Sequence, residues 1–172
     1  AVQFAINVPN FGEYADSRVT AELARASEDA GWDGFFVWDH INVGFEPGTP
    51  MADPWVLLTT VALATERIRI GTMVTPLARR RPWKLARETV TIDHLSGGRL
   101  ILGVGLGIPA DLEFGAFGEE PDGRERAAKL DEGLDVLTGL WSGEPFSYTG
   151  KHYTVADVQF LPMPVQRPRI PI

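Results

Sequence analysis

Two side chains with acid–base chemistry follow an apolar run in the first part of the chain. Asp39 and His40 come directly after GFFVW, which reads as a buried strand. In parallel α/β folds the carboxyl ends of the strands face the ligand, and an imidazole changes its charge near pH 7, so His40 could move a proton there. The alternative is structural: Asp39 would cap the following loop, and His40 would be a hydrogen-bonded polar residue of the core.

Three glycines alternate at the end of another apolar run. Gly103, Gly105 and Gly107 lie in LILGVGLG. Glycine is unfavourable inside a strand unless something approaches the backbone closely, and a flat ring or a cofactor tail would supply that reason. Tight helix–strand packing is the alternative, chiefly for Gly103. The spacing differs from the dinucleotide-binding fingerprint.

Three consecutive arginines follow the run IRIGTMV. Arg79, Arg80 and Arg81 fall in the loop on the ligand-facing side, where guanidinium groups could hold an anionic tail; a solvated loop is the alternative. His94 and His152 have no metal-ligand spacing, so the sequence predicts no metal site.

A repeated unit must position these residues. The apolar runs QFAINV, GFFVW, IRIGTMV and LILGVG begin roughly 31 to 34 residues apart. Between and after them, helical patterns cover about 18–30, 54–65, 82–95 and 124–141, the second opening with Asp53 as N-cap and Pro54. Strands that are apolar on both faces and alternate with helices predict an α/β fold, with a parallel sheet covered by helices.

The chain changes character after the fourth helical pattern. Residues 144–161 read as a β-hairpin insertion with a turn at Thr149 and Gly150, and PMPVQRPRIPI ends on what reads as the start of a fifth strand. Four βα units are half of an eightfold barrel, which typically needs about 250 residues. We therefore expect residues 1–172 to form a single domain, a partial barrel that is truncated, cleaved or naturally shortened.

Composition narrows the classes of partner. The chain has 172 residues, of which 44% are hydrophobic and 23% charged, as in an ordinary globular domain. A formal net charge of −7 gives no reason to expect nucleic acid or an anionic membrane. The absence of cysteine excludes disulfides and thiol nucleophiles. The opening AVQFAINVPN has no signal-peptide pattern and no apolar run reaches about 18 residues, so we expect a cytoplasmic protein.

The order and spacing of these segments resemble the bacterial luciferase-like monooxygenase superfamily, whose members use FMN or the deazaflavin coenzyme F420 on a TIM (β/α)8 barrel. The resemblance covers essentially the whole chain. It rests on FAINVPNFG, AGWDGFFVWDH, ADPW, TERIRIGTMVTP, RRRPWKLARETVTIDHLSGGRLILGVGLG, FG, DEGLDVLTGLW and YTGKHY, in this order. It implies that this chain is the N-terminal half of such a barrel.

The resemblance implies roles for the first strand ends. In F420-dependent relatives the residue matching Asp39 helps to bind the cofactor, and the residue matching His40 lies close to the reactive ring, so we expect His40 to be catalytic. Relatives also hold a non-proline cis peptide at the end of the third strand, as a bulge against the ring. Here it would join Met73 and Val74, and Thr72, Met73 and Val74 would contact the cofactor.

At the end of the fourth strand, the resemblance implies that Gly105, Leu106 and Gly107 face the ring, and Asp111 stands where some relatives place a cofactor-binding amide.

One position departs from the family pattern. F420-dependent sugar-phosphate dehydrogenases of this family place a catalytic glutamate directly after the fourth-strand glycines, where this chain has Ile108. This counts against membership of that branch. Glu113 is the nearest glutamate and could substitute for it, but we expect a solvated loop acid.

The function implied by the resemblance is a flavin- or deazaflavin-dependent oxidoreductase, acting by hydride transfer or oxygen activation on a small organic substrate. As it stands, the chain is expected to be weak or inactive. The alternative is a shortened, non-catalytic flavin-binding or interaction protein of the same superfamily. Relatives dimerise through their second and third helices, so we expect a homo-oligomer, a dimer. An aldolase-type barrel is disfavoured because no lysine ends a strand.

Overall fold

A four-stranded parallel sheet forms the centre of the molecule. The computed structural model describes residues 2–44 and 46–172. The strands β1 (Ala5–Val8), β2 (Gly34–Val37), β3 (Arg69–Pro76) and β4 (Leu100–Gly105) lie in chain order, and each neighbouring pair is parallel. They coincide with the four apolar runs, so the predicted sheet is confirmed.

The helices begin and end close to the predicted residues. They are α1 (Ser17–Asp29), α2 (Pro54–Ala64), α3 (Pro82–Leu95) and α5 (Gly123–Trp141). The carboxylate of Asp53 caps α2 by accepting hydrogen bonds from the N–H groups of Trp55 and Val56 at 2.9 and 3.0 Å. Pro54 begins this helix, where its missing N–H group has no intrahelical partner to lose.

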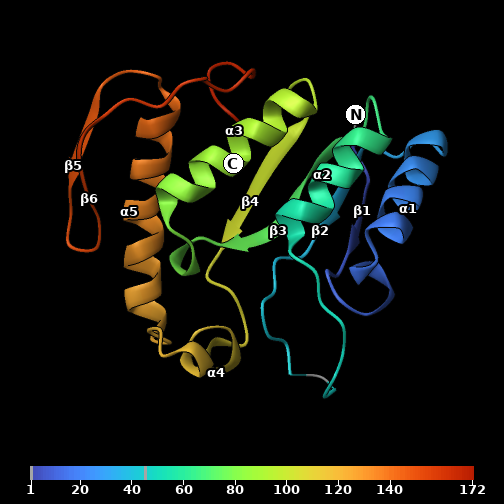
Figure 1. The fold of residues 1–172 in the computed structure, drawn as a ribbon, viewed down its shortest axis with the longest axis horizontal. Coiled ribbons are helices and arrows are strands. Elements are labelled where there is room, and N and C mark those ends of the chain that lie inside the picture. The colour runs from blue at the N-terminus through green and yellow to red at the C-terminus, as the bar shows by residue number, and fades with distance from the viewer. Residues whose placement is uncertain (1, 45) are drawn as a thin grey trace.

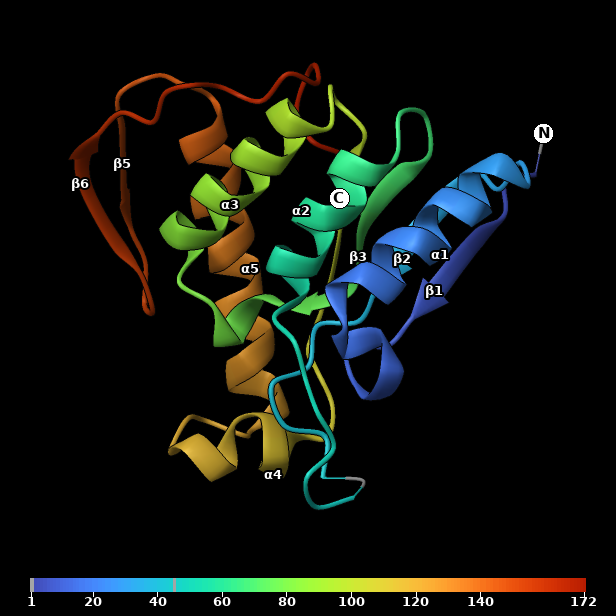
Figure 2. The ribbon, with the colours of Figure 1, turned by 45° about the vertical axis from the view of Figure 1, so that its right-hand side comes forward.

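The helices α1, α2 and α3 lie across one face of the sheet (Figures 1 and 2). Adjacent helices pack on one another, α1 on α2 and α2 on α3, and α3 packs on α5. The core lies between this helical layer and the sheet. Its fully buried strand residues are Phe35, Val37, Ile70, Leu100 and Leu102.

The opposite face of the sheet depends on glycine for close strand pairing. A Cβ atom at Gly71 would lie 1.8 Å from the carbonyl oxygen of Ile101 and 3.2 Å from the ring of Phe36. A Cβ atom at Gly34 would lie 2.7 Å from the same ring. The ring of Phe36 therefore covers two glycines on neighbouring strands.

A two-stranded antiparallel hairpin, β5 (Phe146–Thr149) and β6 (Thr154–Val158), lies within residues 144–161, on the outer side of α5 (Figure 1). One carboxylate anchors its turn to the helix. Glu132 on α5 accepts hydrogen bonds from the backbone N–H groups of Lys151, His152 and Tyr153. Strand β5 ends at Thr149, and the turn after it is closed by the N–H of Gly150, which donates to the carbonyl of Tyr153 at 2.9 Å.

The last residues of the chain return to the sheet. Leu102 of β4 donates its backbone N–H to the carbonyl of Pro171 at 2.9 Å, and Ile170 is fully buried. Among the described residues this segment forms no regular strand. It nevertheless lies where the expected fifth strand would pair with β4.

Three short helical segments lie at the carboxyl end of the sheet: η2 (Leu77–Arg79), α4 (Ala110–Glu113) and η3 (Gly115–Phe117). A fourth, η1 (Gly12–Ala15), follows β1. With the loop between β2 and α2 they surround the candidate site. Figure 1 shows α4 and this loop side by side below the strand ends.

Candidate functional site

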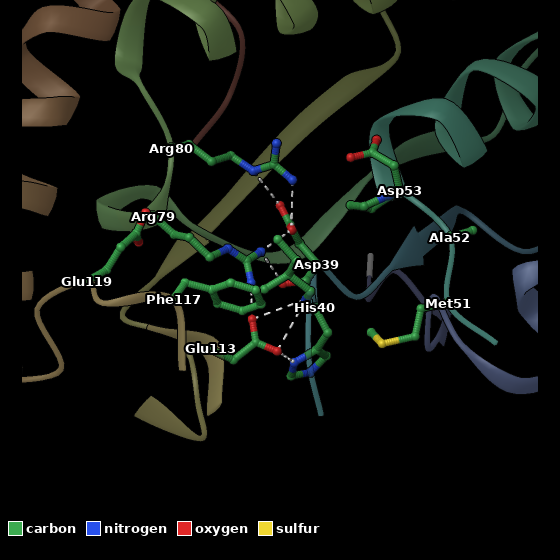
Figure 3. A pocket seen from close by; sticks show the side chains of 12 residues that line it. Asp39, His40, Met51, Ala52, Asp53, Arg79, Arg80, Glu113, Phe117 and Glu119 are labelled. Carbon is green, nitrogen blue, oxygen red and sulfur yellow. Dashed lines mark hydrogen bonds and ion pairs between the residues drawn. The ribbon is translucent and has the colours of Figure 1, made fainter. Parts of the chain in front are cut away.

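A buried network of charged side chains joins the ends of β2, β3 and β4. Asp39 and His40 follow β2, Arg79 and Arg80 follow β3, and Glu113 ends α4, which follows β4. Figure 3 shows the five side chains pointing toward one another. The carboxyl ends of parallel strands meet at one edge of a sheet, which explains why bonded partners 34 to 73 positions apart in the chain become neighbours.

Asp39 is the acceptor at the centre of this network. Its buried carboxylate accepts hydrogen bonds from Arg80 Nε at 2.9 Å, from Arg80 Nη2 at 2.8 Å and from the Thr75 hydroxyl at 2.9 Å, and it pairs with Arg79. Its oxygens are therefore engaged by groups of the chain itself. Neither capping of the following loop nor direct contact with a ligand is needed to explain its burial.

Of the three arginines that follow β3, Arg79 and Arg80 are paired with carboxylates and Arg81 is exposed. Arg79 pairs with both Asp39 and Glu113, and Arg80 pairs with Asp39 and lies 3.9 Å from Glu88. Burial lowers the pKa of Arg79 against the attraction of Asp39. For Arg80 burial also acts to lower the pKa, but Asp39, Asp53 and Glu88 together outweigh it and raise the pKa. Both guanidinium groups pair with internal carboxylates, which differs from both roles weighed from the sequence, a solvated loop and an anionic-tail site. Arg81 is exposed, just before α3.

Glu113 corrects the expectation of a solvated loop acid. Its side chain is fully buried and receives hydrogen bonds from Arg79, from the backbone N–H groups of Ile41 and Asn42 at 3.1 to 3.2 Å, and from His40. All of these partners are donors, which an ionised carboxylate suits because it can only accept. The short helix α4 folds back over the loop after β2 and carries this carboxylate inward.

His40 is held at one ring nitrogen and open at the other. Nδ1 lies 2.9 Å from Oε1 of Glu113, and the backbone N–H of His40 donates to Asn10 at 3.1 Å. Nε2 has no hydrogen-bond partner among the described residues. Burial lowers the pKa of His40, with the Arg79 charge acting in the same direction and Asp39 opposing it. This direction favours the neutral imidazole, in which one ring nitrogen donates and the other accepts.

Three residues that the sequence argument missed support His40. Phe11 and Trp38 pack edge-on against the imidazole, with ring centroids 6.2 and 5.7 Å away. The buried Asn10 donates to the carbonyls of His40 and Ala52 at 2.8 and 2.7 Å. Asn10 and Phe11 closely follow β1, so the strand-end rule that selected Asp39 and His40 could have found them.

The bond between Met73 and Val74 is cis, as the resemblance implies. The pairing of β3 with β4 shifts register between Thr72 and Thr75 around it. Met73 is 45% exposed. Thr72 is fully buried, and its hydroxyl lies 3.2 Å from the carbonyl of Gly103 and 2.9 Å from the hydroxyl of Thr75, which donates its own hydrogen to Asp39. Of the predicted contacts in this segment, Met73 is thus accessible and Thr72 is used inside the sheet.

The strand-end glycines have packing partners within the chain. A Cβ atom at Gly105 would lie 2.7 Å from the side chain of Val74, and one at Gly107, whose φ is +79°, would lie 2.7 Å from Pro76. A Cβ atom at Gly103 would lie 2.3 Å from the carbonyl of Thr72. Close approach of β4 to β3 therefore explains all three glycines without a ligand, and their contact with a ring stays a prediction.

Two further predicted contacts differ in surroundings. Leu106 is 40% exposed just after β4, close to the accessible strand end. Asp111 lies in α4 with its side chain toward solvent. Asp111, which the sequence predicts as a cofactor contact, is therefore exposed. The carboxylate of α4 that points into the site is that of Glu113.

A cavity of about 440 Å³ opens beside this network. Apolar side chains of Ile41, Met51 and Phe117 also line it. Figure 3 shows Phe117 beside Arg79 and Glu113, and Met51 on the side of Ala52. Its lining is Asp39, His40, Ile41, Met51, Ala52, Asp53, Pro54, Arg79, Arg80, Glu113, Phe117 and Glu119. A concave site with converging polar groups at the carboxyl end of parallel strands is typical of a small-molecule site.

Comparison with known proteins decides the family. A sequence model of the luciferase-like monooxygenase family matches residues 3–172. The chain belongs to this family. The resemblance stated from the sequence is thereby confirmed over essentially its full extent.

The curated relatives of this luciferase-like protein include enzymes of two kinds. This chain is 35% identical over 154 residues to an F420-dependent glucose-6-phosphate dehydrogenase from Beutenbergia cavernae. The match covers 85% of this chain and 42% of the relative. This chain is 36% identical over 154 residues to a 4-hydroxyprotoasukamycin monooxygenase from Streptomyces nodosus subsp. asukaensis, covering 88% and 39%. The chain spans less than half the length of these relatives, and the near-equal identities do not separate dehydrogenase from monooxygenase.

Solved structures confirm the fold of the luciferase-like chain. A monooxygenase from Streptomyces bottropensis superposes with a TM-score of 0.83 at 28% identity, covering 98% of this chain and 52% of that one. The F420-dependent tetrahydromethanopterin reductase from Methanopyrus kandleri gives 0.80 at 25% identity, covering 96% and 47%. These are TIM-barrel enzymes, so the predicted α/β partial barrel is confirmed.

Across residues 2–44 and 46–172, no three acidic or histidine side chains are grouped in a way that could hold a metal ion. No helix in that part of the chain combines the length and apolarity needed to cross a membrane.

Proposed function

We propose that this chain supplies the cofactor-facing half of a flavin- or deazaflavin-dependent oxidoreductase that acts on a small organic substrate. The observation that carries the proposal is His40: its Nδ1 is held by a buried carboxylate, and its Nε2 is without a protein partner in the described chain, beside a cavity at the carboxyl end of the sheet. FMN and coenzyme F420 are both open as the cofactor, because this fold is shared by a 3,6-diketocamphane monooxygenase solved in complex with FMN and by the F420-dependent reductase from Methanopyrus kandleri.

The residues at the strand ends fit a flat ring. Met73 and Leu106, at the ends of β3 and β4, expose 45% and 40% of their surface although both are large and apolar. A flat aromatic ring would cover such side chains, and Val74, Gly105 and Gly107 complete the predicted contact surface. When bound, the flavin or deazaflavin supplies the redox chemistry.

The side chains of the network then have distinct tasks. His40, neutral at pH 7, accepts or returns a proton at Nε2. Asp39 holds Arg79 and Arg80 in place and acts on the cofactor site through them. The aromatic rings of Phe11 and Trp38 restrict the imidazole and exclude water from its faces.

The whole-chain organisation is part of the proposal. We treat residues 1–172 as one domain with 144–161 as an inserted hairpin, since one cluster of buried side chains runs from β1 to Ile170. A homodimer through α2 and α3, which the family resemblance implies, is supported by the exposed apolar side chains of Val56 and Leu63 on α2.

Cofactor titration tests the proposal. Adding FMN or F420 to the purified chain should quench cofactor fluorescence with saturation. Where reduced cofactor is turned over, His40→Gln should keep binding and lower the rate by about 10²- to 10⁴-fold. His94→Gln, on the outer helix α3, is the matched control and should change neither. No saturable binding of either cofactor would contradict the proposal, and binding without turnover would favour the non-catalytic flavin-binding alternative.

A further inference from the structure

We propose that Glu113 is the positioning residue of this site: its carboxylate selects the Nδ1–H tautomer of His40 and holds the loop after β2, so that Nε2 is presented as a proton acceptor. The chemical role of Nε2 rests on the proposed function, whereas the positioning is a property of the chain alone. A glutamate that acts through His40 is distinct from one that contacts the substrate directly.

The contacts of Glu113 come from two separate segments of the chain. From the loop after β2 come Nδ1 of His40 at 2.9 Å and the N–H groups of Ile41 and Asn42. From the segment after β3 comes the guanidinium of Arg79. The carbonyl of Leu112, next to Glu113, also accepts from the Asn42 side chain at 3.3 Å. Helix α4 and the loop after β2 are therefore attached to each other around one carboxylate.

The carboxylate determines which nitrogen of His40 carries the proton. A neutral imidazole has one N–H donor and one acceptor, and the bond made by one nitrogen sets the state of the other. An ionised carboxylate 2.9 Å from Nδ1 accepts only, so the proton lies on Nδ1. Hydrogen bonds to charged groups contribute about 1.5–3 kcal/mol, which corresponds to a tautomer ratio of about tenfold or more.

Arg79 keeps the carboxylate ionised and in place. Glu113 is fully buried, and a buried carboxylate stays charged only when it is paired and hydrogen-bonded. The guanidinium also donates to the backbone carbonyl of Asp39 at 3.0 Å, the residue before His40. Arg79 therefore fixes the main chain just before His40, at Asp39. Glu113 fixes the main chain just after it, at Ile41 and Asn42.

The test replaces the charge but retains the shape. In Glu113→Gln the carboxamide can accept from Nδ1–H or donate to an unprotonated Nδ1, so both tautomers become possible. Glu113→Asp retains the charge on a shorter side chain. Glu119→Gln is the matched control, because Glu119 lines the same cavity without a hydrogen bond to His40. His40→Gln assigns the ring signals.

Three readouts apply to the chain without cofactor. Long-range proton–nitrogen NMR spectra of the ring give the tautomer ratio, their pH dependence gives the pKa of His40, and amide hydrogen exchange reports on Ile41 and Asn42. We expect the wild type to show at least about tenfold excess of the Nδ1–H form. Glu113→Gln should lose most of this excess and lower the pKa of His40 further, because a negative neighbour is removed. Glu113→Asp should restore part of the excess, and Glu119→Gln should resemble the wild type.

The outcomes separate the two proposals. An unchanged tautomer ratio and pKa of His40 in Glu113→Gln, or an equal change in Glu119→Gln, would overturn the positioning role. Failure of the wild type to bind FMN or F420 would remove the proposed function and leave the tautomer result standing. Where turnover is measured, Glu113→Gln should lower kcat more than it changes KM, and adding His40→Gln should cause little further loss.

Discussion

Removal of the Asp39 carboxylate is the most direct probe of the charged network. In Asp39→Ala the guanidinium of Arg80 loses two hydrogen bonds of 2.8 and 2.9 Å, the Thr75 hydroxyl loses its acceptor, and Arg79 loses one of its two carboxylates. Asp39→Asn retains the shape and one acceptor oxygen but removes the charge. Both variants leave two cations in a site that the native fold has closed around an anion.

The size of the effect follows from burial. Removing one partner of a buried ion pair costs about 3–5 kcal/mol, because the other charge is left uncompensated. Arg79 retains Glu113, and Arg80 retains Glu88 at 3.9 Å, so the lower end applies. We therefore expect Asp39→Ala to lower the free energy of unfolding by about 3 kcal/mol and Asp39→Asn by about 2 kcal/mol.

Urea unfolding followed by tryptophan fluorescence measures this loss. Trp38 is next to the altered residue, and with a slope of about 2 kcal/mol per molar urea the midpoint of Asp39→Ala should fall by about 1.5 M. Asp131→Ala, an exposed carboxylate on α5, is the control and should stay within about 0.5 kcal/mol of the wild type. A loss below about 1 kcal/mol for Asp39→Ala, with an unchanged slope, would refute the buried-network reasoning.

Three further perturbations test other parts of the fold. Gly71→Ala should lower the unfolding free energy by about 3 kcal/mol or more, because its Cβ atom would lie 1.8 Å from the Ile101 carbonyl oxygen. Gly115→Ala is the control: its Cβ atom meets open space, so the same urea assay should show almost no change. Equal effects of the two substitutions would contradict the packing argument. Burial alone would raise the pKa of Glu28, but hydrogen bonds from the N–H groups of Ile68, Arg67 and Glu66 outweigh burial and lower the pKa. The wild type should therefore be more stable than Glu28→Gln at pH 7, and this difference should disappear as the pH falls through the lowered pKa. A stability difference that persists in acid would contradict this explanation. Glu132→Ala should speed amide exchange at residues 151–153 with little change in the sheet, and unchanged exchange there would show that the hairpin turn has another anchor.

Much of the architecture was predictable because its signals are local. The apolar runs mark β1 to β4 since a strand of a covered parallel sheet is buried on both faces. Asp53 and Pro54 mark the start of α2 through capping chemistry that involves only the next few residues. The position of Asp39 and His40 at a strand end followed from the same reasoning, and the cis bond between Met73 and Val74 from the family resemblance.

The partners of the site residues were not predictable in the same way. Glu113 reads as a loop acid because a lone carboxylate in a short loop segment is ordinarily solvated, and its buried partners lie far away in the chain. Its contacts with His40, Ile41 and Asn42 span about seventy residues and exist because α4 folds back across the loop after β2. The arginines after β3 likewise read as free cations until the fold brings Asp39 and Glu113 against them.

The sequence by itself thus determined the order of strands and helices, the edge of the sheet at which the site lies, and the family. Only the tertiary structure decided which charges neutralise one another, which nitrogen of His40 stays free, and that the alternating glycines already have packing partners in β3. The physical reason is range. Hydrophobic periodicity and capping act between near neighbours in the chain, whereas the ionisation and orientation of a buried side chain depend on groups that distant segments place within about 3 Å of it.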